Sequence, residues 1–392
     1  MHHKLANLHW LTILVASLIF CIAGKTIAAD EGQKNVLTVG EAKYYSWRSR
    51  NNNASGNQIV IPITWSTTSI SDNYSLEVSM RTAYIRSENR TPSQTGVVSG
   101  LGDTVLSLFG SYAMSPKVVP FVVTSFNLPT GKETLSGSQK NALMDIDLVE
   151  QVRHGEGLNM NIGGRVTYNF NETTSTTISA SRNFRGGYIP DGDLNLKYEP
   201  GTQTTVFGQV DYHTDRVSGL FGLKYSEERT SRFGGSDFFQ PGDVYEGYAS
   251  LSVAINERDL LSGFLSFAKF SKNESFDPFQ QAFVEEKAVG AGNVTSFRGT
   301  WQRAYRWGRF GLNGSLLRRD ENDFDAVNDQ FIPARLKLTI GPEAVVTLPG
   351  GLSAILNAGY FRLKEESTVF TGQDQKFDGV EVSIGLRKEM DL

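Results

Sequence analysis

Hydrophobic and polar side chains alternate one for one along most of the chain beyond residue 57. Between Leu158 and Phe170, even positions hold apolar side chains or glycine and odd positions hold polar side chains or glycine. Period-two alternation of this length predicts a strand with one apolar and one polar face. The pattern recurs at Leu76–Tyr84, Val217–Tyr225, Tyr245–Ile255, Leu336–Ile340 and Val380–Leu386. The longer of these runs have the roughly nine to eleven residues that a tilted strand needs to cross a bilayer.

The predicted connections between strands alternate in length. Short turns are expected at His213–Arg216, Asn256–Asp259, Arg306–Arg309 and Leu348–Gly351. Long polar loops are expected between them, at Arg229–Asp243, Asn273–Ala288, Asp320–Pro333 and Glu365–Lys376. Short turns at one end and long loops at the other are typical of an outer-membrane β-barrel. The predicted fold is therefore all-β, an antiparallel transmembrane barrel with short periplasmic turns and long extracellular loops.

The alternative is a secreted, water-soluble β-sandwich or propeller, whose strands also alternate. Aromatic side chains argue against it, because many fall at or near predicted strand ends, where a membrane interface collects them. These aromatic residues are Tyr168, Phe170, Tyr212, Tyr225, Tyr245, Trp301, Tyr305, Trp307 and Tyr360.

The expected number of strands is about 14 to 16, at two strands, one short turn and one long loop per hairpin. A direct count that starts near Asn57 gives sixteen, but it leaves a conflict between Asn141 and Phe184. There the pattern predicts three strands joined by two short turns, at His154–Gly157 and Asn171–Thr173, which breaks the alternation of turn lengths.

The first residues have the layout of a secretory signal peptide. A basic start precedes an apolar stretch from Leu11 to Ala23, and small residues follow at the expected cleavage site after Ala28 or Ala29. The expected organisation is a signal peptide over residues 1–29, an N-terminal segment over residues 30–56 and a barrel over residues 57–392. The segment 30–56 holds Tyr44, Tyr45 and Trp47, and it is predicted to form either a plug in the lumen or an additional edge strand.

Composition narrows the possible partners and cofactors. The only cysteine, Cys21, lies in the expected signal peptide, so the exported chain would have neither disulfides nor thiolate metal sites. A formal net charge of −4 argues against nucleic acid as a partner. The acidic stretch Asp320–Asp325 lacks the glycine and terminal glutamate of a calcium loop. No cofactor and no metal are predicted.

Two motifs carry a family resemblance. They are Ser99-Gly100-Leu101-Gly102-Asp103-Thr104-Val105-Leu106 and Phe126-Asn127-Leu128-Pro129-Thr130-Gly131-Lys132. Together they resemble the strand-pair signature of outer-membrane channels of the phenol meta-pathway (MetA-type) transporter family, which is distantly similar to the fatty-acid transporter barrels. The resemblance implies a channel for a small molecule, such as a hydrophobic or aromatic compound. It does not identify a particular substrate.

Charged side chains on the polar register are expected to line the lumen. They are Glu77, Arg81, Asp145, Asp147, Arg165, Lys224, Arg335, Lys337, Glu381 and Arg387. Charges of both signs in a wide barrel either create a transverse field that orients solutes or pair with one another and fill the interior. Passage of a solute and a merely structural interior both remain open at this point.

Function therefore divides into three hypotheses. The first is a channel for passive uptake or export of a small solute. The second is a structural or adhesive barrel whose extracellular loops bind a partner. The third is a barrel hydrolase, since His213 lies between Asp211 and Asp215 with Ser218 nearby. His213 falls at a predicted periplasmic turn, whereas barrel hydrolases work at the outer rim, so no enzyme activity is predicted.

The expected partners are outer-membrane lipid, the transported small molecule and the barrel-assembly machinery. That machinery commonly reads a terminal aromatic residue on the lipid-facing register. Leu386, Lys388, Met390 and Leu392 keep this register, but the last residue is a leucine.

Overall fold

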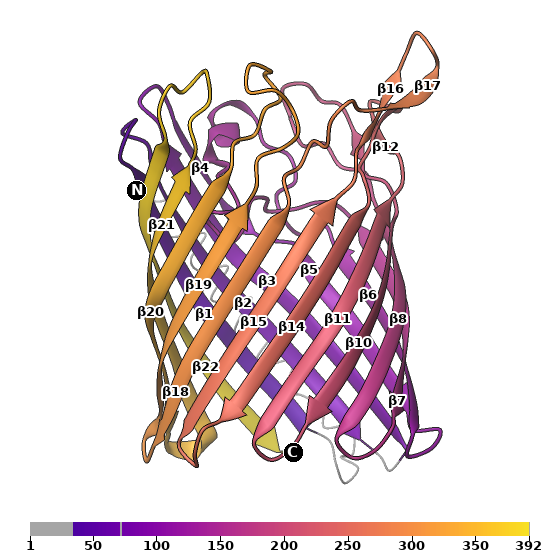
Figure 1. Cartoon of the computed structure of the whole chain (residues 1–392), viewed down its shortest axis with the longest axis vertical. Helices are drawn as coiled ribbons and strands as arrows, with labels where there is room; N and C mark the ends of the chain where they lie inside the picture. The colour runs from indigo at the N-terminus through magenta and orange to yellow at the C-terminus, as the bar shows by residue number, and fades with distance from the viewer. Residues whose placement is uncertain (1–33, 71–72, 392) are drawn as a thin grey trace, which may run out of the picture.

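The computed structural model describes residues 34–70 and 73–391, and these residues form a closed antiparallel β-barrel (Figure 1). The barrel has sixteen strands in the described ranges. The first are β1 (Lys34–Ser49), β2 (Ser55–Ile70), β3 (Tyr74–Arg90), β4 (Thr95–Leu101) with β5 (Thr104–Tyr112), β6 (Val118–Leu128), β7 (Asn159–Asn169) and β8 (Thr174–Arg185). The others are β10 (Gln203–His213), β11 (Val217–Glu228), β14 (Val244–Ala254), β15 (Asp259–Phe270), β18 (Val294–Tyr305), β19 (Gly308–Arg319), β20 (Arg335–Leu348), β21 (Leu352–Glu365) and β22 (Gln375–Asp391).

The barrel is closed by its first and last strands. β1 pairs with β2 on one side and with β22 on the other, from Lys34 opposite Asp391 to Ser49 opposite Phe377. The segment 30–56, predicted as a plug or an edge strand, thus contributes a full wall strand from Lys34, and the barrel begins before residue 57. The expected signal peptide and Leu392 lie outside the described residues.

β4 and β5 form one wall strand with an interruption. β4 pairs with the upper part of β3 and β5 with the lower part, and Gly102 and Asp103 lie between the two pieces. The register shifts by one residue there, from Tyr84 opposite Leu101 to Arg81 opposite Val105. An irregularity of this kind re-aims a side chain away from the regular pleat.

The two ends of the barrel differ as expected. The four predicted short turns are confirmed between β10 and β11, β14 and β15, β18 and β19, and β20 and β21. At the other end, two predicted loops and the connection between β8 and β10 contain short strands that join in a small separate sheet: β9 (Tyr198–Glu199), β12 (Ser231–Phe233), β13 (Ser236–Gln240), β16 (Glu274–Asp277) and β17 (Ala282–Glu285). The β16–β17 hairpin rises well above the rim (Figure 1).

The outer face of the wall is apolar. Leu223, Leu251, Ile340 and Ile384 on the predicted apolar register are exposed in the isolated chain, as lipid-facing side chains must be. Aromatic side chains gather near both ends of the wall. Tyr305 stacks on Trp307 at the turn end with ring centroids 5.5 Å apart, and Tyr225 packs on Tyr245 toward the loop end.

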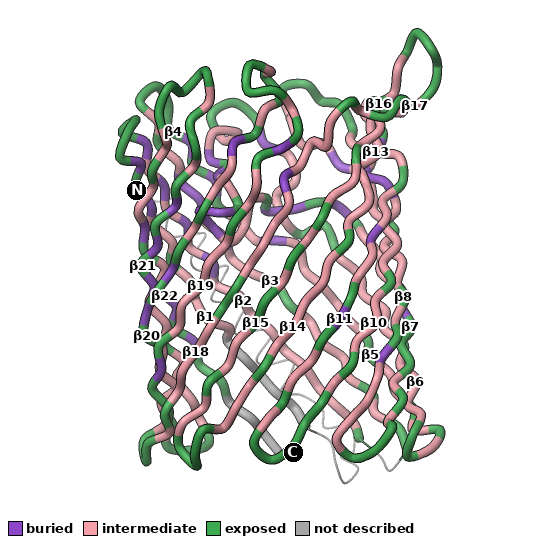
Figure 2. The backbone as a smooth tube through the Cα atoms, in the orientation of Figure 1, coloured by how far each residue is buried: buried purple, intermediate pink, exposed green. Residues whose placement is uncertain are grey.

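Burial is concentrated inside the barrel. Figure 2 shows buried chain gathered in the upper part of the molecule, where interior segments cross the wall strands. Within the described ranges, none of the helical segments is both long and apolar enough to cross a membrane.

The sequence prediction is wrong between Asn141 and Arg153. No strand forms there: residues 129–158, which we call the inner loop, run between β6 and β7 and include only one short 3-10 helix, η1 (Gly137–Ala142). His154–Gly157, which was predicted as a short hairpin turn, is therefore the end of this loop. Asp145 and Asp147 belong to the inner loop, although they were expected on a strand. This removes the extra strand and restores the alternation of short and long connections.

The lipid-facing register predicts the effect of placing a charge on each face of one strand. Leu251 lies in the half of β14 nearer the turn end and faces lipid, whereas its neighbour Ser250 faces the lumen. Leu251→Arg should lower the free energy of unfolding in lipid vesicles by up to about 2–4 kcal/mol, because the guanidinium would be placed in hydrocarbon. Ser250→Arg is the matched control and should cost much less. Equal losses in urea titrations of the two variants would contradict the assigned register.

Candidate functional site

The inner loop crosses the lumen and docks on the wall far from its own strands. Its residues contact β1, β2 and β3 on one side and reach β19 and β20 beyond the closure of the barrel. A long connection that folds inward narrows a barrel that would otherwise be wide at sixteen strands. The inner loop and the wall around it are therefore the candidate functional site.

Asp103 ties both ends of the inner loop to the wall. Its carboxylate oxygens accept hydrogen bonds from the backbone N–H of Gly131 at 2.9 Å, from the backbone N–H of Glu156 at 2.8 Å and from the side-chain amide of Asn127 at 2.7 Å. Gly131 lies near the start of the loop and Glu156 near its end. The interruption between β4 and β5 places the carboxylate where it can reach both.

The two ends of the loop cross at van der Waals distance. A Cβ atom on Gly131 would lie 2.0 Å from the carbonyl oxygen of His154, and one on Gly155 would lie 2.9 Å from the carbonyl carbon of Gly131. Neither position has room for a side chain. Thr130 completes this neck, because its hydroxyl donates to the carbonyl oxygen of Gly102 at 3.0 Å.

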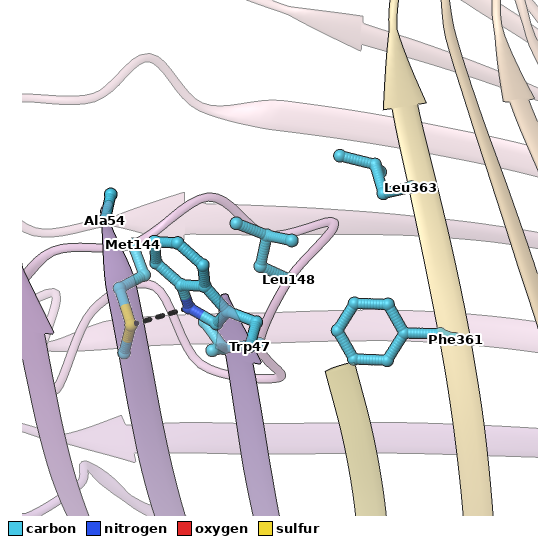
Figure 3. Close-up of a cluster of buried hydrophobic side chains, with 7 residues drawn as sticks. Trp47, Ala54, Met144, Leu148, Phe361 and Leu363 are labelled. Carbon is cyan, nitrogen blue, oxygen red and sulfur yellow. Dashed lines mark hydrogen bonds between the residues drawn. The ribbon is translucent and has the colours of Figure 1, made fainter. Parts of the chain in front are cut away.

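A buried apolar cluster anchors the middle of the loop (Figure 3). Met144 and Leu148 of the loop pack with Trp47 of β1 and with Phe361 and Leu363 of β21. The indole N–H of Trp47 donates to the sulfur of Met144 at 3.4 Å. Burying a side chain of this size stabilises the docked loop by about 1.5–3 kcal/mol.

Charged groups next to this cluster clamp the loop to the wall. The Arg335 guanidinium pairs with Asp145 and also reaches Asp147 at 3.4 Å. Asp147 is buried and has a second partner in Arg319, also at 3.4 Å. The loop carboxylates therefore neutralise cations of β19 and β20 within the lumen, where an unpaired buried charge would be costly.

A second clamp lies on β1 and β2. Glu150 accepts hydrogen bonds from the Lys43 ammonium at 3.0 Å and from the Tyr45 hydroxyl at 2.9 Å. The fully buried Gln58 side chain exchanges two hydrogen bonds with the backbone of Gln151. These contacts hold the returning arm of the loop along the wall.

His154 lies at the end of this arm and is only 4% exposed. Its Nε2 lies 3.4 Å from the hydroxyl of Ser87, while its Nδ1 has no hydrogen-bond partner in the described part of the chain. Burial lowers the pKa of His154 from 6.5 to about 4, and the nearby charge of Lys132 acts in the same direction. The imidazole is therefore neutral when the loop is docked at neutral pH.

The β8–β10 connection covers the outer side of the inner loop. Leu135 pairs with Asp191 in a parallel bridge, and Lys140 forms ion pairs with Asp191 at 3.0 Å and with Asp193 at 2.8 Å. Hydrogen bonds from Lys140 hold the pKa of both carboxyls below their ordinary range. Two connections thus fold together over the lumen.

The predicted lumen residues lie in different surroundings. Arg335, Asp145 and Asp147 come together in the clamp. Lys337 lies 4.3 Å from the ring centroid of the buried Phe361, and Arg165 lies 4.1 Å from that of Phe121. Lys224 pairs with Glu246 of the neighbouring strand, and Arg81 and Glu381 line two separate cavities. Glu77 lies on β3 opposite Phe109 of β5, and Arg387 lies on β22 opposite Ser353 of β21.

Several residues of the site were missed from the sequence. Trp47, Gln58 and Glu150 were not singled out as loop contacts, because no local pattern connects them to residues some hundred positions away. The signal for Asp103 was present, since both quoted motifs meet at the neck: one supplies Gly102 and Asp103, and the other supplies Asn127, Thr130 and Gly131.

Two cavities remain beside the docked loop. The larger, of about 980 Å³, lies between the returning arm of the loop and the wall from β1 to β8. The smaller, of about 420 Å³, lies between β1 and the wall from β18 to β22. Away from the clamp, hydroxyl pairs line the lumen: Thr167 with Thr177, Thr205 with Ser226, Ser252 with Ser262 and Ser266 with Ser296.

No arrangement of reacting groups surrounds His213. It ends β10 opposite Ser218, and within the described ranges its side chain forms no hydrogen bond with a carboxylate or hydroxyl. The carboxylate of Asp211 instead accepts from the side-chain amide of Gln209. In residues 34–70 and 73–391, no three His, Cys, Asp or Glu side chains are grouped so that they could hold a metal ion.

A closed barrel with an apolar outer face, aromatic girdles and a polar interior defines an outer-membrane β-barrel. No protein-family model matches the chain, and no curated protein matches it in sequence. Solved structures match remotely. A Pseudomonas putida F1 outer-membrane channel is 12% identical, with a TM-score of 0.43 over 62% of this chain and 90% of that one.

Two further structures match over most of this chain. The deltaS2S3 mutant of TodX, a monoaromatic hydrocarbon channel, is 10% identical with a TM-score of 0.43, over 92% of this chain and 91% of that one. A triple mutant of the Rhodopseudomonas blastica porin is 10% identical with a TM-score of 0.37, over 91% of this chain and all of that one.

Asp103→Asn tests the neck of the inner loop. Gly131 donates to Oδ1 and Glu156 donates to Oδ2, and an asparagine has an acceptor oxygen at only one of these two positions, so one of the two hydrogen bonds is lost. Each lost hydrogen bond to the carboxylate costs about 1.5–3 kcal/mol. The loop should become sensitive to added protease in the folded barrel, and single-channel conductance should rise. Asp211→Asn removes the same charge from the lumen wall and should leave the loop resistant. Protection of the loop in both variants would contradict the role of Asp103.

The lowered pKa of His154 predicts that docking of the inner loop weakens in mild acid. A released loop takes up the His154 proton near pH 6.5, whereas the docked loop resists it until about pH 4, so docking is strongest above pH 6.5 and declines as the pH falls. Protease cleavage of the loop should increase between pH 7 and pH ~4.5 in the native protein. His154→Gln should flatten this dependence. The same pH profile in both proteins would assign the effect to other groups.

Proposed function

We propose that this protein is a passive outer-membrane channel for small solutes, with the inner loop as its constriction. The observation that carries the proposal is the way the loop is docked. Its carboxylates are paired with wall cations on one sector of the barrel, and cavities lined by polar side chains remain beside it. A barrel that serves only as an anchor has no need for a built constriction with space around it.

The polar lining supports passage of solutes through water. Inward positions of β7 and β8 are mainly serine, threonine and asparagine, and Thr205, Gln209, Ser252, Ser262 and Ser266 add hydroxyl and amide groups on β10, β14 and β15. Such groups hydrogen-bond a passing solute without trapping it by charge. The sequence resemblance to hydrocarbon-associated channels adds the finer expectation of hydrophobic or aromatic cargo. Solutes with both polar and apolar parts fit this lumen best, because apolar side chains also line the larger cavity.

Liposome swelling with solutes of graded size tests the proposal. Purified protein in vesicles should admit small sugars and amino acids at rates that fall steeply with solute size, since the constriction sets the limit. Asp103→Asn should relax this size dependence. Absence of swelling with every solute would reject a channel and favour the barrel whose loops bind a partner.

The extracellular hairpin provides a matched control. Replacing the tip of the β16–β17 hairpin, where Phe279 is 97% exposed, with two glycines should leave swelling rates unchanged, because the tip lies outside the lumen. A loss of flux in this variant would place the limiting barrier in the outer loops and contradict the inner loop as the constriction.

A further inference from the structure

The larger cavity has the size of a binding site for a small molecule. Its volume of about 980 Å³ lies within the roughly 300–1,000 Å³ typical of ligand pockets. The returning arm of the inner loop forms one side, and the wall strands β1 to β8 form the other. A solute that passes the constriction on this side contacts both.

One part of this wall is a patch of uncharged hydrogen-bonding side chains. Ser125, Asn161 and Asn183 lie opposite one another on β6, β7 and β8, and Asn127 and Asn159 form the adjacent row. Within the described ranges, the side chains of Ser125, Asn161 and Asn183 form no hydrogen bond with the protein. The two free amides therefore offer donors and acceptors together, which match hydroxyl groups or amides of a solute.

Another part of the same cavity is apolar. Val60 pairs with Ile85, and Pro62 pairs with Ala83, in two rows across β2 and β3. Ile146 of the inner loop lines the cavity from the other side and is 61% exposed. Exposure of an isoleucine side chain to water inside a polar lumen is energetically unfavourable unless an apolar group of a bound molecule covers it.

The charges around the cavity nearly cancel. Glu150 is paired with Lys43, and Asp103 is satisfied by three N–H groups. Of the other charged cavity side chains within the described ranges, Glu41, Arg81, Arg153 and Glu156 have no ion-pair partner, and they are two anions and two cations. With Asp103 counted, the cavity has a formal net charge of only −1, which gives little preference for a charged ligand.

The spacing of the two patches sets the length of the ligand. β3 and β7 are separated by β5 and β6, so the apolar row on β3 and the amide row on β7 lie about 14 Å apart along the wall at the usual strand spacing. We propose that this cavity is a binding subsite for an uncharged, elongated amphiphile with an apolar group at one end and hydroxyl or amide groups at the other. The subsite rests on the proposed channel function, because a solute reaches it through the lumen.

Phenyl β-D-glucoside is a suitable probe, since it joins an apolar ring to a hydroxyl-bearing ring. In planar bilayers it should reduce the ionic current through single channels in a saturable manner. Glucose lacks the apolar ring and phenyl β-D-glucuronide adds a negative charge, so both should require at least about tenfold higher concentrations for the same block.

Two variants address the two patches separately. The double variant Asn161→Leu with Asn183→Leu should weaken block by phenyl β-D-glucoside roughly tenfold, because the hydroxyl end loses its partners. Ile146→Asn should weaken the same block by reducing the contact with the phenyl ring. Asn313→Leu is the matched control, since Asn313 on β19 lines only the smaller cavity, and it should leave the block unchanged.

The outcomes separate this subsite from the channel itself. Channels that conduct ions but are blocked equally by all three probes would overturn the subsite and leave the channel function standing. Equal block in the double variant and in Asn313→Leu would also overturn it. Absence of ionic current in every protein, native chain included, would reject the channel function.

Discussion

A single carboxylate determines the shape of the lumen. Asp103 lies at a break in a wall strand and accepts N–H groups from both ends of the inner loop, so it fixes where the loop leaves the wall and where it returns. The residues between these two ends contribute to the apolar cluster around Trp47 and to the ion pairs of Arg335. Three N–H donors satisfy the carboxylate, and no cation is needed at the neck.

The docked loop divides the interior into two kinds of surface. On the sector from β19 to β1, opposite charges meet and cancel, and apolar side chains fill the gaps between them. On the remaining sector, serine, threonine and asparagine side chains are interspersed with charged groups such as Arg165 and the Lys224–Glu246 pair. Desolvation makes the first sector rigid and costly to open, whereas the second can exchange water for solute at little cost.

The wall was predictable from the sequence because its rule is local. Alternation of side chains along each strand and the position of turn residues fixed the strands, the turn end and the apolar face, as β7 and β11 illustrate. The inner loop was not predictable in the same way. Its stretch from Asn141 to Arg153 has enough alternation to resemble a strand, and its partners Lys43 and Arg335 lie far away in sequence. Only the tertiary fold decides between pairing in the wall and docking across the lumen.

Closure of the barrel through β1 and β22 has a consequence for its folding. The two strands that complete the hydrogen-bonded ring are the first and last of the described chain, so the contact of longest sequence separation is also the one that closes it. Contacts of this kind form late, because the entropy of a long chain segment must be lost before they contribute. Until then both edges expose unpaired backbone, which is prone to pairing with other chains. The risk of aggregation during folding therefore depends on how quickly β1 pairs with β22.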